Sequence, residues 1–255
     1  MNDVIHSPFE VFAISLVVQW LSAWSGAFFL RKRRTLNDDE REDFGIVLTA
    51  TLTLLALIIG FSFSVAISRY DMRKNYEEAE ANAIGTEYVR ADLLPAADAA
   101  KVRSLLRKYL DQRLLFYRTG NAHQLQQINS YTAKLQADLW SAVHVPAMTN
   151  PTPVTALAVS GMNDVLNSQG YTQAAYWNRI PIGEWGLMAV IAICANLLVG
   201  YSSRRAERES ILLLLLPAIL SVSFMLISDI DSPRGGLIRV RPQNLESLAQ
   251  SLHEH

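Results

Sequence analysis

Two groups of charged residues follow apolar stretches of this chain and could act on ions. The first group comprises Arg69, Asp71, Arg73, Glu78 and Glu80, and the second comprises Asp229, Asp231 and Arg234. Opposed charges at a bilayer boundary could clamp helix ends together. Repeated in each subunit of an oligomer, they could instead form a ring that selects ions at a pore mouth. Carboxylates of Asp229, Asp231 and Glu80 would suit a divalent cation, but no loop has the spacing of a calcium motif, so we predict no metal site.

A second candidate site lies inside an apolar stretch, where Gly60, Ser64 and Ser68 recur at intervals of four residues. A stripe of small residues allows membrane helices to approach closely. Such a stripe could also leave room for ions in a pore wall. The gate would then be the neighbouring, mostly apolar row of Thr53, Leu57 and Phe61. Spacing alone leaves helix packing and pore lining open.

Patterns typical of enzymes are missing from the sequence. We find no glycine-rich phosphate loop, no nucleophile elbow and no paired His-Glu arrangement for hydrolysis, so we predict neither an enzyme nor a cofactor. The single cysteine, Cys194, cannot form an intrachain disulfide. A net charge of -1 argues against a nucleic-acid partner, because basic residues are not in excess.

Four apolar stretches must position these candidate sites. They run from about Val11 to Leu30, Ile46 to Ser68, Trp185 to Tyr201 and Ile211 to Ile227. A bilayer core about 30 Å thick needs about twenty apolar residues per helical crossing. Only nine residues, 202–210, separate the last two stretches, which predicts an antiparallel hairpin. The sequence therefore predicts an all-α membrane protein with four transmembrane helices in two hairpin-like pairs.

The chain divides by composition into four parts. Residues 1–69 form the first transmembrane pair with its basic short loop, and residues 70–182 form a helical extramembrane domain inserted between the second and third membrane helices. Residues 183–230 form the second transmembrane pair, and residues 231–255 form a C-terminal tail with a short helix.

Helical periodicity continues through the central domain. The second membrane helix is expected to extend beyond the bilayer until Pro95, and the next helix to end at Thr119-Gly120-Asn121. A helix from about His123 to Val143 follows, which Pro146 should interrupt, with these residues facing inward: Leu125, Ile128, Tyr131, Leu135, Leu139 and Trp140. Pro153 suits the first turn of a final helix that ends near Ser168.

Basic residues in the two short loops indicate the membrane orientation. They are Arg31, Lys32, Arg33, Arg34 and Arg41 in the first loop and Arg204, Arg205 and Arg208 in the second. The positive-inside rule then places the short loops in the cytoplasm and the large domain outside. Bases on the other side weaken the contrast: Arg69, Arg73, Lys74, Arg234, Arg239 and Arg241.

Several motifs resemble a known family. Gly60-Phe61 followed by Arg69-Tyr70, where the second membrane helix leaves the bilayer, resembles the corresponding motif of bestrophin channels. Three further segments look like signatures of a bacterial family of uncharacterised bestrophin-like membrane proteins: Glu80-Ala81-Asn82-Ala83-Ile84-Gly85-Thr86, Ser160-Gly161-Met162-Asn163-Asp164 and Asp231-Ser232-Pro233-Arg234-Gly235-Gly236.

This resemblance implies a function. Bestrophins are pentameric anion channels whose second helices line a pore with an apolar neck, which the resemblance places at Thr53, Leu57 and Phe61. It implies a homo-oligomer, a pentamer by analogy, in a bacterial inner membrane. It also implies a cytoplasmic central segment, opposite to the orientation that the charges indicate. A membrane-anchored scaffold or sensor, whose extramembrane helices bind a partner, is the alternative.

Overall fold

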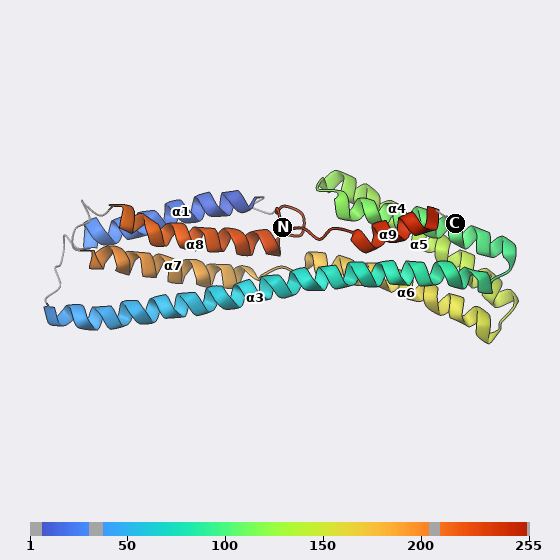
Figure 1. Ribbon diagram of the computed structural model, residues 1–255, viewed down its shortest axis with the longest axis horizontal. Helices are drawn as coiled ribbons and strands as arrows, with labels where there is room; N and C mark the ends of the chain where they lie inside the picture. The colour runs from blue at the N-terminus through green and yellow to red at the C-terminus, as the bar shows by residue number, and fades with distance from the viewer. Residues whose placement is uncertain (1–6, 31–37, 204–209, 254–255) are drawn as a thin grey trace. The chain divides into compact units, whose positions relative to one another are not determined.

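The computed structural model describes residues 7–30, 38–203 and 210–253, and these ranges are helical with no strand. Helix α1 (Pro8–Ser25) continues as a π-helical segment, η1 (Gly26–Leu30). Helix α3 (Asp38–Arg90) contains the second apolar stretch, and helices α7 (Ile182–Ser202) and α8 (Ser210–Asp231) contain the third and fourth (Figure 1). Within the described residues, four helices are long and apolar enough to cross a membrane. The predicted all-α membrane fold is confirmed.

The remaining helices belong to the central segment and the tail. A short 3₁₀ helix, η2 (Ala91–Leu93), follows α3 and precedes α4 (Ala96–Arg118). Helices α5 (Ala122–Thr149) and α6 (Pro153–Trp177) complete the central segment, and α9 (Gln243–His253) lies in the tail. By internal contacts the chain forms two compact units, one of residues 1–68 and 179–238 and the other of residues 69–178 and 239–255.

In the first unit, α1 packs against α7 and α8. Glycines allow the closest approach: a Cβ atom at Gly200 of α7 would lie 1.9 Å from the Ala23 carbonyl oxygen of α1, and one at Gly26 would lie 2.1 Å from the Leu197 carbonyl oxygen. Small residues at membrane-helix crossings have this role. The buried side-chain amide of Asn196 in α7 donates to Gln19 Oε1 of α1 at 3.2 Å, which joins the two helices by a hydrogen bond.

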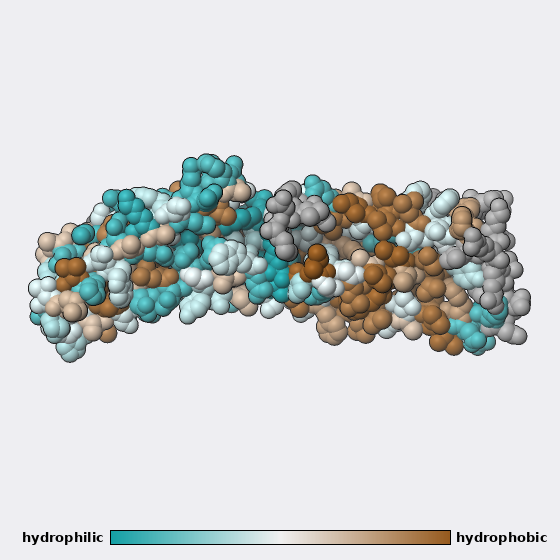
Figure 2. All heavy atoms as spheres, turned by 180° about the vertical axis from the view of Figure 1, so that it is seen from behind, coloured by the Kyte–Doolittle hydropathy of each residue, from teal (hydrophilic) through white to brown (hydrophobic). Residues whose placement is uncertain are grey.

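In the second unit, the hydrophobic core lies between α3, α4, α5, α6 and α9. Its largest contributors are fully buried residues such as Ile84, Leu106, Tyr109 and Leu139. Each helix contributes one apolar face because a helix presents a new side chain about every 100°. Seen from behind, hydrophobic surface gathers over the first unit and hydrophilic surface over the second (Figure 2).

Capping residues set the beginnings of α5 and α6. The Asn121 side chain accepts hydrogen bonds from the amides of His123 and Gln124, at 2.9 and 3.2 Å. Thr152 caps α6, and Pro153 occupies its first turn as predicted. A proline costs no hydrogen bond there, because first-turn amides have no partner within the helix.

Several predictions for the central helices are wrong. Pro146 lies inside α5, which continues to Thr149, and α6 continues beyond Ser168 to Trp177. A helix with a proline can continue where tertiary packing outweighs the lost hydrogen bond, and Pro146 is itself buried. Tyr131 and Trp140 were predicted to face inward, but they are exposed.

Candidate functional site on helix α3

The apolar part of α3 has two opposite faces. Leu55, Ser62 and Ala66 are buried. The six residues predicted to line a pore are all exposed in the single chain: Thr53, Leu57, Gly60, Phe61, Ser64 and Ser68. At about 3.6 residues per turn, these two sets lie on nearly opposite sides of the helix. One side of the apolar part of α3 is therefore buried against its own unit, and the other side is exposed.

The small-residue stripe lies on this exposed face. A Cβ atom at Gly60 would meet no atom within 4 Å, so among the described residues no helix approaches α3 closely at this glycine. The close approaches instead involve Gly26 and Gly200, described above. Ser64 and Ser68 are exposed as well, so the stripe is available for contact with another molecule.

The row predicted to form the neck, Thr53, Leu57 and Phe61, presents a more apolar surface than its one polar residue type indicates. Leu57 is 53% exposed and Phe61 is 69% exposed. The Thr53 hydroxyl donates its hydrogen to the Thr49 carbonyl oxygen of its own helix at 2.9 Å. Because that hydrogen bond occupies the only donor of the side chain, the threonine offers mainly its methyl group to what lies beside the helix.

A hydrogen bond that the sequence analysis missed attaches α3 to α7. The buried Ser62 hydroxyl donates to Glu184 Oε1 at 2.7 Å. Glu184 lies in the first turn of α7, where the positive end of the helix dipole favours a carboxylate. Ser62 comes directly after Phe61, so this bond fixes which face of α3 turns away from the unit.

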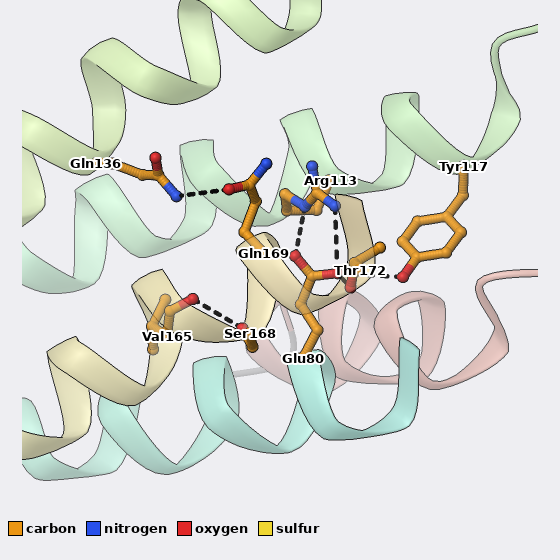
Figure 3. A network of polar contacts seen from close by, with 8 residues as sticks. All are labelled: Glu80, Arg113, Tyr117, Gln136, Val165, Ser168, Gln169 and Thr172. Carbon is orange, nitrogen blue, oxygen red and sulfur yellow. Dashed lines mark hydrogen bonds and ion pairs between the residues drawn. The ribbon is translucent and has the colours of Figure 1, made fainter. Parts of the chain in front are cut away.

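In the second unit, Glu80 lies inside a buried network. Its carboxylate pairs with Arg113 Nε, and Oε2 accepts hydrogen bonds from Tyr117 at 3.2 Å and Thr172 at 3.3 Å. Figure 3 shows these side chains converging from α3, α4 and α6. Burial acts to lower the pKa of Arg113, but Glu80 holds it above its usual value. Burial raises the pKa of the Tyr117 hydroxyl.

The other charges that follow the apolar part of α3 differ in exposure. Arg73 is buried and its Nε donates to the Ala175 carbonyl oxygen at 3.3 Å. Arg69 Nη1 donates to Asn178 Oδ1 at 3.0 Å. Asp71 and Glu78 are exposed. The first predicted charge group is therefore divided, because Arg73 and Glu80 serve the interior of the second unit whereas Asp71 and Glu78 face outward.

The second charge group shapes the chain around the end of α8. Asp231 accepts hydrogen bonds from the Ile180 amide at 3.1 and 3.2 Å. Asp229 accepts from the amides of Leu237 and Ile238 at 2.6 and 3.1 Å. A Cβ atom at Gly236 would lie 2.4 Å from Asp229 Oδ1, which explains why this turn contains a glycine. Arg234, the third member of the group, is half-buried.

These contacts oppose the divalent-cation interpretation. The carboxylates of Asp229 and Asp231 already accept backbone hydrogen bonds, and Glu80 pairs with an arginine. Among the described residues, no group of three or more histidine, cysteine, aspartate or glutamate side chains could hold a metal ion. The basic residues of the short loops, Arg31 to Arg34 and Arg204, Arg205 and Arg208, lie outside the described residues.

Glu77 and Glu87 were not among the residues predicted from sequence. Both are buried, at 1% and 0% exposure, and they lie on the same side of α3 as Arg73, Glu80 and Ile84. These buried residues follow one another at steps of three or four residues, which places them on one side of the helix. That side continues the buried side of the apolar stretch, so the spacing alone could have predicted their burial. Their partners come from other helices, which spacing cannot reveal.

Comparisons with known proteins identify a family and several solved structures with a similar fold. A family model described as "Bestrophin-like domain" matches residues 13–245. A crystal structure of a bacterial bestrophin homolog from Klebsiella pneumoniae, phased by Zn-SAD, matches with a TM-score of 0.63 and 13% identity over 96% of this chain and 97% of that one. A single-substitution variant of that homolog matches with a TM-score of 0.66 and 11% identity, over 96% and 97%. No curated protein matches the sequence.

Proposed function

We propose, from the premise that this chain belongs to the bestrophin-like family, that it assembles into an oligomeric ion channel whose α3 helices line the pore. The fold resembles that of bacterial bestrophin structures over nearly the whole chain. The observation that carries the proposal is the pair of opposite faces on α3. Leu55, Ser62 and Ala66 are buried, whereas the six proposed pore residues are exposed.

In an oligomer, the exposed face of α3 could line a pore. If several copies meet along α3, each copy contributes one row of small and apolar side chains to a common axis. Leu57 and Phe61 would then form the narrow neck, since rings of apolar side chains can gate by dewetting. Gly60, Ser64 and Ser68 would leave room beside it, because they carry little or no side chain.

We propose that two exposed carboxylates of α3, Asp71 and Glu78, lie at the mouth of the pore. Asp71 follows Thr53 by eighteen residues, and Glu78 follows Gly60 by eighteen residues. Eighteen residues make about five helical turns, so by periodicity Asp71 and Glu78 continue the side of the helix that carries the pore residues. Repeated in each copy, they would form a negatively charged ring that attracts cations to the pore mouth.

Single-channel recording tests the proposal. Purified full-length protein in planar bilayers should give unitary currents, and Phe61→Ala or Leu57→Ala should change their size or gating. Val17→Ala is the matched control, because Val17 of α1 is also an exposed apolar residue of a membrane helix, at 54% exposure, but lies on another helix. Silent bilayers from a well-folded oligomer would favour a membrane-anchored scaffold instead.

The number of subunits and the membrane location are part of the proposal. By family resemblance we propose a pentamer in the bacterial inner membrane, which particle symmetry in cryo-electron microscopy would test. Close to the ends of the membrane helices, the bases of the two short loops outnumber those on the opposite side, so we propose that the short loops lie in the cytoplasm. A Gly120→Cys change in a Cys194→Ser background would be labelled by an impermeant maleimide in intact spheroplasts if this orientation is right.

A further inference from the structure

Glu87 is a buried carboxyl group near the C-terminal end of α3. None of its surface is exposed, and within the described part of the chain neither Oε1 nor Oε2 accepts a hydrogen bond. Other buried carboxylates of the same helix have such partners: Glu80 has Arg113, and Glu77 has the first amides of α9. An ionised carboxylate without a hydrogen bond is costly to bury, so Glu87 needs another explanation.

The site around Glu87 depends on a glycine. A Cβ atom at Gly161 of α6 would lie 2.0 Å from Glu87 Oε2 and 2.7 Å from Arg90 Nη1. The carboxyl group and the guanidinium therefore both occupy space that any other residue at position 161 would fill. Gly161 is buried, so the site lies where α3 packs against α6.

Two charged side chains act on the Glu87 carboxyl group. Arg90 comes from α3 itself, three residues after Glu87, and Asp164 comes from α6. Asp92 of η2 pairs with Arg103 of α4, and so its charge is matched. Burial raises the pKa of Glu87 to about 8, with Arg90 acting to lower it and Asp164 acting to raise it.

A proton is the ligand that fits this site best. A metal cation would need several oxygen ligands, and it would lie beside the Arg90 guanidinium, which repels it. A proton removes the charge of Glu87 without a further ligand. The surroundings therefore suit a neutral carboxylic acid.

We propose that Glu87 is a proton-binding site, neutral at physiological pH, whose ionisation at higher pH weakens the packing of α6 on α3. Loss of the proton would place a negative charge where, in the described part of the chain, neither carboxyl oxygen accepts a hydrogen bond. The carboxylate would then turn toward Arg90 and leave the space beside Gly161. The inference concerns the second unit alone and does not depend on ion conduction.

The direction of the pH effect follows from linkage. The pKa of Glu87 is about 8 in the folded protein, against 4.5 for an ordinary glutamate. Between these two values the folded chain holds a proton that the unfolded chain has lost. The contribution to stability is therefore complete below about pH 4.5 and is lost as the pH rises through about 8.

Infrared difference spectroscopy tests the proton directly on the full-length wild-type protein. Spectra recorded below and above about pH 8 should differ by the C=O stretch of one protonated carboxylic acid. That band should be missing in Glu87→Gln, which keeps the shape of the neutral acid. A wild-type spectrum without the band, or a band that persists in Glu87→Gln, would overturn the assignment.

Thermal unfolding gives a second, independent measurement. The midpoint of wild type should fall more steeply than that of Glu87→Gln as the pH rises from about 6 to about 9. Asp111→Asn, which removes an exposed carboxylate of α4, should follow the wild-type slope. Parallel profiles for wild type and Glu87→Gln would contradict the proposal.

Discussion

Gly200 and Ala23 are in backbone contact where α7 crosses α1. A Cβ atom at position 200 would lie 1.9 Å from the Ala23 carbonyl oxygen, and a backbone atom cannot turn away as a side chain can. The reciprocal contact is equally close, since a Cβ atom at Gly26 would lie 2.1 Å from the Leu197 carbonyl oxygen. Two glycines therefore set the distance between these membrane helices.

We expect Gly200→Ala to lower the thermal unfolding midpoint of the purified protein, because α1 and α7 must separate to admit the methyl group. Overpacking of this kind costs about 1–3 kcal/mol or more. Gly186→Ala is the control on the same helix, where a Cβ atom would meet nothing within 4 Å. The crossing would not be as tight as described if both variants unfolded with the wild-type protein.

Removing the charge of only one partner of the Glu80–Arg113 pair should destabilise the protein strongly. Both side chains are fully buried, so Glu80→Gln leaves an arginine charge without its partner. We expect a loss of about 3–5 kcal/mol in unfolding free energy, measured by chemical denaturation in detergent. Glu246→Gln serves as the control, because Glu246 pairs with Arg118 at an exposed position, and such pairs contribute about 0–1 kcal/mol.

A double replacement separates charge from packing at the same pair. Glu80→Leu combined with Arg113→Met removes both charges and keeps apolar volume. We expect this variant to be more stable than Glu80→Gln, because no unpaired charge stays buried. A double variant as unstable as the single one would show that the network contributes through its hydrogen bonds with Tyr117 and Thr172 instead.

Glu77 should hold the C-terminal helix in place. Its Oε1 accepts hydrogen bonds from the amides of Asn244 and Leu245, both at 3.0 Å, at the start of α9. Glu77→Ala removes the acceptor for these orphan amides, and we expect faster hydrogen exchange in residues 243–253. Glu78→Ala, at the exposed neighbouring position, should leave that exchange unchanged. Equal exchange in both variants would exclude a capping role.

The sequence could predict the membrane helices because apolar composition and length are decided locally. The same local signals failed at Pro146, where tertiary packing of α5 outweighs the lost hydrogen bond. They also placed Glu80 with the exposed charges at the membrane boundary, because a row of nearby charges does not show which side of the helix is buried. The pairing of Ser62 with Glu184, 122 residues apart, depends on tertiary structure and has no signal in spacing.

Cysteine accessibility should distinguish a pore from a lipid-facing surface on α3. In a Cys194→Ser background, we expect Ser64→Cys and Ser68→Cys to react with a charged methanethiosulfonate reagent and to change the current. The reaction requires thiolate, which forms in water and not among acyl chains. Val17→Cys in α1 is exposed in the single chain but should stay unreactive, because we place it against lipid. If Ser64→Cys reacted no faster than Val17→Cys, the exposed face of α3 would lie in lipid or in a dry subunit contact, and α3 would not line a water-filled pore.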